Sequence, residues 1–267
     1  MSSPGGGQSL HPGSVSVVIP CKDDAEPLAR CLAALEAQTR RADEVIVVDN
    51  GSSDDSAATA LAFGARVLPC PEPGIPAASS TGYDAARGEF ILRLDADCLP
   101  APDWIEAVVR AFSEQPGTSA VTGWASFHDG PAALRRVLAA LYLGAYTFAG
   151  ILALGHRPLF GSNLSMRRSA WCAVRSTVHR DDPEMHDDLD LSFHLGERHQ
   201  IGRLVENRMT MSMRPLSSSA GLRLRMRRGF TTVVAHWPEH LPPYRWHRRR
   251  KLGRADLYRV SDISTQL

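Results

Sequence analysis

The sequence has 267 residues, of which 43% are apolar, and its formal net charge is +1. This length suits one α/β domain of generous size, alone or with an extension. The five Cys residues are odd in number and lack CxxC spacing, which argues against a disulfide framework or a cysteine zinc site and predicts reduced thiols in a cytoplasmic protein. Residues 1–14 have neither a basic start nor an apolar core, so we expect a disordered leader and not a signal peptide.

Four short apolar runs predict buried strands at residues 15–20, 44–49, 66–68 and from residue 90 onward. The segments between them carry helix signals. The first has an apolar face (Leu28, Leu32, Leu35). The second has a cap at Ser52 with Asp55 and a stop at Gly64, and the third has a start at Pro76 and a stop at Gly88. Strands that alternate with helices pair in parallel through right-handed crossovers. The sequence therefore predicts an α/β fold with a mainly parallel sheet and helices on both faces.

Acidic residues follow the carboxyl ends of three of these strands, at Asp23, Asp49, Asp95 and Asp97. Residues i and i+2 of an extended chain point to the same side, so Asp95 and Asp97 can converge. Two close carboxylates favour a hard divalent cation, although Asp is also common in plain turns. Ligands of such sheets bind outside the carboxyl ends of the strands, which indicates a site for a nucleotide and its metal. These loops contain neither GxGxxG nor GxxxxGK[ST], which argues against the ordinary dinucleotide and P-loop sites.

The second half of the chain continues the alternation. Apolar residues at helical spacing predict a helix around residues 105–112, and strands are expected at 118–127 and 201–205. Asp187 begins a further predicted helix that runs to about His199. The simplest expectation for the acidic residues at its start is a favourable interaction with the helix dipole. Trp124 lies in the strand expected at 118–127, where it either stacks on a sugar or packs in the core.

Five segments taken together resemble glycosyltransferase family 2, over roughly residues 15–200. They are Val17-Val18-Ile19-Pro20, the run from Val47-Val48-Asp49 to Asp54, Gly88-Glu89 before Leu94-Asp95-Ala96-Asp97, the run from Gly161-Ser162-Asn163 to Arg168, and Asp187-Asp188-Leu189-Asp190-Leu191-Ser192. The resemblance implies the GT-A fold, a Rossmann-like fold of nucleotide-diphospho-sugar transferases. It also implies an inverting enzyme that uses a nucleoside-diphosphate sugar and Mn²⁺ or Mg²⁺.

The resemblance also assigns roles to individual residues. Asp49 would contact the base, Asp95 the ribose or the metal, and Asp97 the metal on the diphosphate, while Asp188 would be the general base. The remaining donor-binding residues would be Pro20, Cys21, Asp23 and Ala96, and the acceptor side would include Trp124, Gly161, Ser162, Asn163 and Asp187. The chain departs from the family pattern at three places: Ser79-Ser80 replaces Arg-Asn, Asp187 replaces Glu, and His194 replaces Arg. The first departure removes one cation near the donor.

Residues 137–154 form a run of 18 residues without a charge. About 20 residues are needed to span a bilayer, and a spanning helix here would place the two halves of the site on opposite sides of the membrane. The segment is therefore expected either to be a buried helix or to lie in a membrane interface.

The end of the chain is basic, with 14 Lys and Arg against four Asp and Glu from residue 201 onward. Aromatic residues are interleaved with this charge, as at Tyr244 and Trp246, which suits an anionic membrane surface or diphosphate groups better than nucleic acid. We therefore expect a cytoplasmic protein that docks on the inner face of the cell membrane, with a lipid-linked or polymer sugar as acceptor.

The resulting prediction is an inverting, metal-dependent glycosyltransferase. Its catalytic domain is expected at 15–215, with a donor half at 15–98 and an acceptor half at 99–215, followed by a basic extension at 216–267. Two alternatives stay open at this point: a sugar nucleotidyltransferase, which would need a better phosphate loop after the first strand, and a nucleotide-sugar or glycan-binding protein that has lost catalysis.

Overall fold

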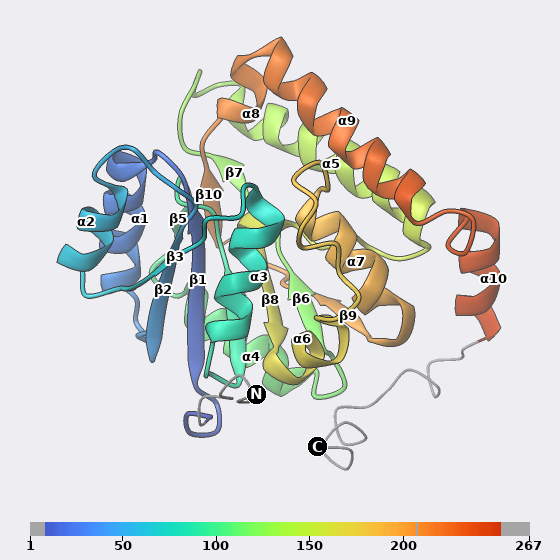
Figure 1. Cartoon of the computed structure of the whole chain (residues 1–267), viewed down its shortest axis with the longest axis horizontal. Coiled ribbons are helices and arrows are strands. Elements are labelled where there is room, and N and C mark those ends of the chain that lie inside the picture. Colours follow the sequence, from blue (N-terminus) through green and yellow to red (C-terminus); the bar gives the residue numbers. More distant parts are fainter. Residues whose placement is uncertain (1–8, 207, 252–267) are drawn as a thin grey trace.

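A seven-stranded sheet forms the centre of the computed structural model, which describes residues 9–206 and 208–251. The strands lie in the order β3-β2-β1-β4-β8-β6-β9 (Figure 1). Neighbouring strands pair in parallel, except that β8 is antiparallel to both β4 and β6. The predicted mainly parallel sheet is therefore confirmed. The strand bounds are β1 Val15–Cys21, β2 Glu44–Asp49, β3 Arg66–Pro69, β4 Phe90–Arg93, β6 Ala120–Thr122, β8 Leu164–Arg167 and β9 Ile201–Arg203.

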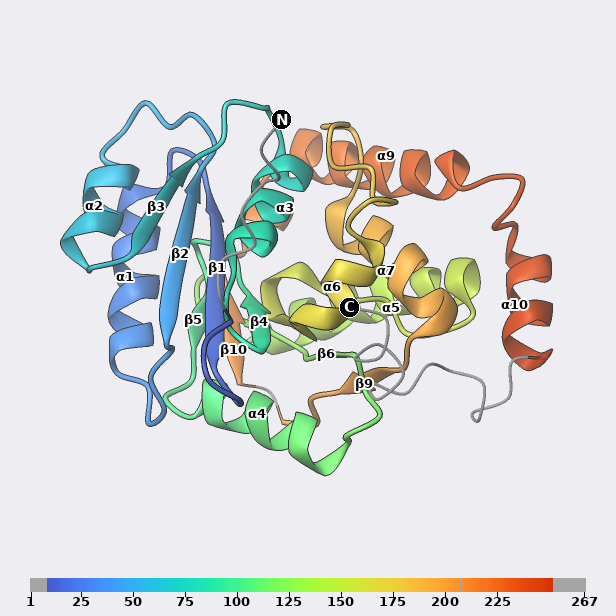
Figure 2. The ribbon, with the colours of Figure 1, turned by 60° about the horizontal axis from the view of Figure 1, so that its bottom comes forward.

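Helices cover both faces of this sheet (Figure 2). One face packs against α1 (Ala25–Glu36), α2 (Ser56–Ala62) and α4 (Trp104–Glu114). The other packs against α3 (Ile75–Ala85), α6 (Arg168–Val174) and α7 (Asp187–Arg198). Along β1, Val17 and Ile19 join the first core and Val18 joins the second. Burial on both faces explains why the strands are apolar throughout and do not alternate with polar residues.

The strand order places the site. The chain runs outward from β1 to β2 and β3, and then returns to lay β4 on the other side of β1. The crevice at the carboxyl ends of β1 and β4 is therefore the point where the strand order reverses, which is where ligands of open α/β sheets bind. Because β8 is antiparallel, the short 3-10 helix before it, Gly161–Asn163, is brought to the same edge.

Two local predictions were wrong. The strand expected at 118–127 is broken into β6 and β7 (Ser126–Phe127), and β7 pairs with β10 (Met209–Met211) in a small sheet that also contains β5 (Leu99–Pro100). Ser52 is not a helix cap, because α2 begins at Ser56 with Asp55 as its N-cap residue; the Ser52 hydroxyl accepts a hydrogen bond from the backbone N–H of Asp23 at 3.0 Å. The predicted stop at Gly64 is confirmed by its left-handed backbone, with φ +72°.

The uncharged segment 137–154 lies within α5 (Arg135–Leu154). The face of α5 that carries Ala139, Leu143, Gly150 and Leu154 is buried, whereas Val137, Leu141, Phe148 and Leu152 are exposed. Their spacing of 4, 11 and 15 residues puts the exposed side chains on one stripe of the helix. In length and composition α5 could cross a membrane, and 22% of its most apolar stretch is buried. Full burial, one of the two expectations, is therefore wrong.

The basic end begins with α8 (Arg214–Ser217), α9 (Ser219–Ala235) and α10 (Pro242–Lys251), and α9 and α10 run along the upper and right edges of Figure 1. Arg245 of α10 is 1% exposed, and its guanidinium donates to the carbonyls of Leu154 and Phe193 at 2.8 and 2.7 Å. These bonds tie α10 to the end of α5 and to the middle of α7, so this part of the basic run is not a solvated tail. The leader predicted at 1–14 and the extension predicted at 216–267 fall partly outside the described residues.

The packing of α3 on the sheet gives a first prediction. A Cβ at Gly82 would lie 2.3 Å from Cγ1 of Val18 and 3.0 Å from Cγ2 of Val48, whereas a Cβ at Gly144 of α5 would meet nothing within 4 Å. We expect Gly82→Ala to lower the free energy of unfolding by about 1–3 kcal/mol through overpacking. Gly144→Ala should leave it unchanged or raise it by up to about 1 kcal/mol. Urea unfolding of both variants checks this, and equal effects would contradict it.

Candidate active site

A cavity of about 620 Å³ opens at the carboxyl ends of β1 and β4, within the size range of small-molecule sites. Its wall includes nine of the residues predicted for the site: Pro20, Cys21, Asp95, Ala96, Asp97, Gly161, Ser162, Asp187 and Asp188. The sequence therefore identified residues from both halves of the chain that the fold does bring together.

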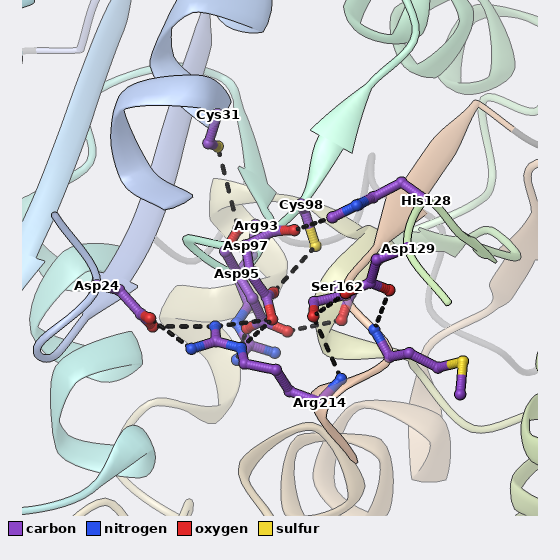
Figure 3. Close-up of polar contacts among 12 residues, drawn as sticks. Asp24, Cys31, Arg93, Asp95, Asp97, Cys98, His128, Asp129, Ser162 and Arg214 are labelled. Atoms are coloured by element: carbon purple, nitrogen blue, oxygen red, sulfur yellow. Dashed lines mark hydrogen bonds and ion pairs between the residues drawn. The ribbon is translucent and has the colours of Figure 1, made fainter. Parts of the chain in front are cut away.

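Asp95 and Asp97 converge, but not because they share a strand. β4 ends at Arg93, and the following residues form a turn closed by a bond from the Cys98 N–H to the Asp95 carbonyl at 3.0 Å. Carboxylate oxygens of Asp95 and Asp97 nevertheless lie within 4.8 Å of each other. Asp95 accepts hydrogen bonds from Arg93 at 2.9 Å and from the Ser162 hydroxyl at 2.6 Å, so β4 and the segment before β8 both fix its position (Figure 3).

Asp97 is paired with an arginine that was not among the predicted site residues. Arg214 donates to Oδ2 of Asp97 at 2.8 and 3.2 Å, and to Asp24 at 2.5 Å (Figure 3). Burial raises the pKa of Asp97 and the neighbouring Asp95 raises it further, whereas Arg214 opposes both. The guanidinium therefore balances negative charge at the edge of the cavity.

The donor atoms at this edge fit a hard divalent cation such as Mn²⁺ or Mg²⁺, which prefers oxygen ligands. Oδ1 of Asp97 faces the Cys98 thiol at 4.0 Å, the far limit for a weak sulfur donor. Burial raises the pKa of Cys98 well above its usual value, so this residue offers no thiolate. Asp97 is the better ligand of Asp95 and Asp97, since its Oδ1 meets only this weak sulfur donor, whereas both oxygens of Asp95 accept hydrogen bonds of 2.6–2.9 Å.

Arg93 joins the two acidic pairs. Its side chain is 3% exposed, and it lies 2.9 Å from Asp95 and 3.3 Å from Asp187. A Cβ at Gly161 would collide with its guanidinium, which explains why glycine stands there. A buried cation between carboxylates of β4 and α7 holds the donor side and the acceptor side of the cavity in one arrangement.

Asp188 and Asp187 begin α7, but their side chains do not cap it. Asp188 accepts bonds from the Gly161 N–H at 2.7 Å and the Tyr146 hydroxyl at 3.1 Å, and pairs with His186 at 2.5 Å. Burial alone would raise the pKa of Asp188, but His186, Arg93 and the Gly161 N–H outweigh it and hold the pKa well below its usual range. The carboxylate is therefore ionised at neutral pH, as a general base must be.

Asp187 differs from its neighbour. Burial raises its pKa and the charge of Asp188 adds to this, while Arg93 opposes both. It also accepts a hydrogen bond from the Ser79 hydroxyl at 3.0 Å. Ser79 stands where the family pattern has Arg. Its hydroxyl donates to Asp187, which itself stands where the family pattern has the longer Glu.

Two predicted donor-side residues lie outside the cavity wall. Asp23 has a left-handed backbone with φ +51° and accepts bonds from the N–H and hydroxyl of Ser53 at 2.7 and 2.9 Å. Asp49 accepts a bond from the Ser52 N–H at 3.1 Å, which closes the turn after β2. The neighbouring Asn50 lines the cavity, and its amide donates to the carbonyls of Cys70 and Glu72.

Two predicted acceptor-side residues also lie outside the cavity wall. Asn163 is 1% exposed, accepts a bond from the Trp104 indole at 3.0 Å and donates to the Trp124 carbonyl at 2.9 Å. Trp124 is partly buried and packs against the core, which is one of the two roles considered for it. The sequence reading missed Tyr146 and four arginines on the wall: Arg93, Arg214, Arg225 and Arg228. Arg225 and Arg228 lie in the Arg-rich run of α9. The alternation of Arg with Leu and Met in this run is the sequence signal that could have identified them.

Comparison with known sequences agrees with this geometry. The model of the family described as Glycosyl transferase family 2 matches residues 16–172. Glycosyltransferase AglE of Haloferax volcanii is 36% identical over 107 residues, which cover 37% of this chain and 35% of that protein. An uncharacterized glycosyltransferase of Mycobacterium tuberculosis is 40% identical over 84 residues, which cover 32% and 37%. The matched part thus spans about a third of the length of these curated relatives.

Solved structures show the same fold. Glucosyl-3-phosphoglycerate synthase of Mycobacterium tuberculosis aligns with a TM-score of 0.60 at 21% identity, over 83% of this chain and 80% of that one. A complex of that enzyme with Mn²⁺, UDP-glucose and phosphoglyceric acid aligns with a TM-score of 0.55 at 21% identity, over 83% and 79%. At this identity the likeness establishes the fold, which is the predicted GT-A fold. Since the family model covers more than half of the chain, the chain belongs to glycosyltransferase family 2.

Proposed function

We propose that this chain transfers a sugar from a nucleoside-diphosphate sugar to an acceptor hydroxyl with inversion at the anomeric carbon. One observation carries the proposal: Asp95 and Asp97 at the end of β4, and Asp187 and Asp188 at the start of α7, line a single cavity and are linked through Arg93. Such a pair of acidic groups supplies both a cation site for a diphosphate and a base for a hydroxyl.

The donor is proposed to be a UDP-sugar, since a structural neighbour binds UDP-glucose together with Mn²⁺. Its nucleoside would lie near Pro20, Cys21 and Asn50, and its diphosphate near Arg214. A Mn²⁺ or Mg²⁺ ion held by Asp97, with Asp95 beside it, would neutralise charge on the departing nucleoside diphosphate. The acceptor is proposed to be a lipid-linked or polymer sugar, and Arg225 and Arg228 would face any phosphate on it.

The reaction is a single displacement. The acceptor oxygen forms a bond to the anomeric carbon while the bond from that carbon to the diphosphate oxygen breaks, and the electron pair leaves with the nucleoside diphosphate. The hydroxyl proton passes to the carboxylate of Asp188, which Gly161, Tyr146 and His186 hold in place. Attack from the face opposite the leaving group inverts the configuration.

The role of Asp97 leads to a binding prediction. Asp97→Asn should abolish the Mn²⁺-dependent part of UDP affinity and leave the protein folded, because the amide is a poor ligand for a hard cation. Asp24→Asn is the matched control, since Asp24 shares the same arginine. Titration calorimetry with UDP, with and without Mn²⁺, measures both. Undiminished Mn²⁺ dependence in Asp97→Asn would refute the metal assignment.

The role of Asp188 leads to a kinetic prediction. Asp188→Asn should lower turnover by about 10²–10⁴-fold with donor binding near wild type, the usual size of a general-base contribution. Release of UDP from UDP-sugars, with water or an added acceptor as nucleophile, gives the rate, and NMR of the product gives its anomeric configuration. If Asp187→Asn loses turnover and Asp188→Asn does not, the base is Asp187. Retention of configuration would overturn the displacement mechanism.

We also propose that the protein docks on the cytoplasmic face of a membrane. The exposed stripe of α5 supports this, since Leu141 and Phe148 are each 66% exposed, as does Phe230 of α9 at 68%. α9 carries four arginines, of which Arg223 and Arg227 lie outside the cavity wall, and each basic residue near an anionic surface contributes about 1 kcal/mol. Arg245 is buried and adds nothing to this attraction.

Vesicle co-sedimentation checks the docking proposal. Wild type should bind vesicles that contain phosphatidylserine, and binding should weaken as salt rises because charges are screened over about 8–10 Å. Leu141→Ser with Phe148→Ser should reduce binding, whereas Leu61→Ser, a change at a residue of α2 that is 63% exposed, should not. Equal recovery in the supernatant under every condition would refute docking and leave the proposed chemistry untouched.

A further inference from the structure

Four side chains that serve no role in the proposed reaction meet behind α7. Asp190 and His194 lie one turn apart on α7, His179 comes from the segment before it, and His236 caps the end of α9. Their ligand atoms all lie within 4.8 Å of one another, and all four residues are outside the cavity wall described above. Asp190 is two residues from Asp188, about 200° around the helix, so the cluster faces away from Asp188.

The spacing of His236, His194 and Asp190 is close to that of a tetrahedral metal site. Metal–ligand distances of about 2.0–2.1 Å at tetrahedral angles require ligand atoms about 3.3–3.4 Å apart. Nε2 of His236 lies 3.4 Å from Oδ1 of Asp190 and 3.4 Å from Nε2 of His194. Nε2 of His194 lies 3.6 Å from Oδ1 of Asp190. Nδ1 of His179 lies 2.7 Å from the same oxygen, which is the distance of a direct hydrogen bond that a bound ion would replace. Three imidazole nitrogens therefore surround one carboxylate oxygen.

The surrounding bonds orient two of these groups as ligands. Nδ1 of His236 lies 2.8 Å from the Thr232 carbonyl, which can only accept, so this nitrogen carries the proton and neutral His236 turns the lone pair of Nε2 toward Asp190. The ring of Phe193 stacks on His236 with centroids 4.0 Å apart. The backbone N–H of His179 donates to Oδ2 of Asp190 at 2.9 Å, which leaves Oδ1 toward the cluster. A lone pair that faces a buried carboxylate is unfavourable unless a cation or a proton lies between them.

We propose that His179, Asp190, His194 and His236 bind one Zn²⁺ ion, distinct from the cation expected at Asp97. Three imidazoles and one carboxylate suit zinc, whereas Mn²⁺ and Mg²⁺ prefer sites made of oxygen atoms. The side chains of Asp190 and His236 are 5% and 3% exposed, so this side of the site is shielded from solvent. His179 is 39% exposed and provides the entry path.

The ion would fasten α9 to α7. α9 carries Arg225 and Arg228 on the cavity wall, and α7 carries Asp187 and Asp188 at its start. Zn²⁺ bound by His236 and by Asp190 with His194 would therefore fix the distance between the arginines and the acidic pair. The role is structural, since the cluster lies apart from the reacting groups.

The test uses the full chain without a polyhistidine tag, in an Asp97→Asn background that removes the other expected metal ligand. Equilibrium dialysis with elemental analysis should find one Zn²⁺ per chain, and Co²⁺ should give the visible absorption of a tetrahedral site. Zn²⁺ should raise Tm. His194→Gln and His236→Gln should each weaken Zn²⁺ binding by more than about 100-fold, the upper end of the cost of losing an outer-shell partner.

His240→Gln is the matched control. The His240 ring lies 5.8 Å from that of His236 but is not part of the four-residue cluster, so this variant should keep its Zn²⁺. Absence of Zn²⁺ in the Asp97→Asn protein, or unchanged affinity in His194→Gln and His236→Gln, would overturn the proposal. Should a variant fail to fold by circular dichroism, the Co²⁺ spectrum of the folded Asp97→Asn protein decides the matter alone.

Discussion

The buried guanidinium of Arg93 is the contact on which the arrangement of the site depends. It extends from the last residue of β4 and reaches both Asp95 and Asp187, which belong to different halves of the chain. Four carboxylates around one cavity repel one another, and each is costly to remove from water unless a positive group compensates it. Removing one partner of a buried ion pair costs about 3–5 kcal/mol because the remaining charge is left uncompensated, so loss of Arg93 would disturb the fold as well as the geometry of the site. Ser162 and Gly161 support this arrangement. The hydroxyl of Ser162 donates to Asp95, and glycine at position 161 leaves room for the guanidinium of Arg93.

The placement of α7 extends this arrangement to the acceptor side. Asp188 is held by a backbone N–H before β8, a tyrosine of α5 and a histidine at the start of its own helix. These three partners come from separate elements, and β8 reaches the site only because it runs antiparallel to β4. One reversed strand in a mainly parallel sheet thus brings the segment 161–163 to the edge where β4 ends.

Much of this could be predicted from the sequence, because burial on both faces leaves a clear record in the strands. The runs at 15–20 and 44–49 are apolar throughout, and the acidic residues after them identify the edge of the sheet where the cavity opens. Asp49 and Asn163 show what a motif cannot specify, since Oδ1 of Asp49 accepts a bond within the turn after β2 and Asn163 accepts one from Trp104, and neither residue lines the cavity. The same limit applies to α5, whose composition could not reveal that only one of its faces would be covered.

The remaining features depend on contacts between distant parts of the chain. Arg214 is 117 positions from Asp97, and the cluster of Asp190 with three histidines draws on residues between 179 and 236. No local periodicity encodes such meetings. The charge pattern predicted that the end of the chain either faces something anionic or is solvated, but not that Arg214 would face carboxylates of the chain's own site.

The pairing of Arg214 with Asp97 and Asp24 has a consequence for the order of ligand binding. A metal ion that arrives alone must compete with a guanidinium already seated on the same carboxylate. If the ion arrived with a diphosphate, the displaced arginine would gain phosphate oxygens as new partners, and the exchange would conserve charge pairing on both sides. On the proposed function, the site would therefore favour the metal–nucleotide complex over either component, and Arg214 would act as an internal counter-ion that the complete donor replaces.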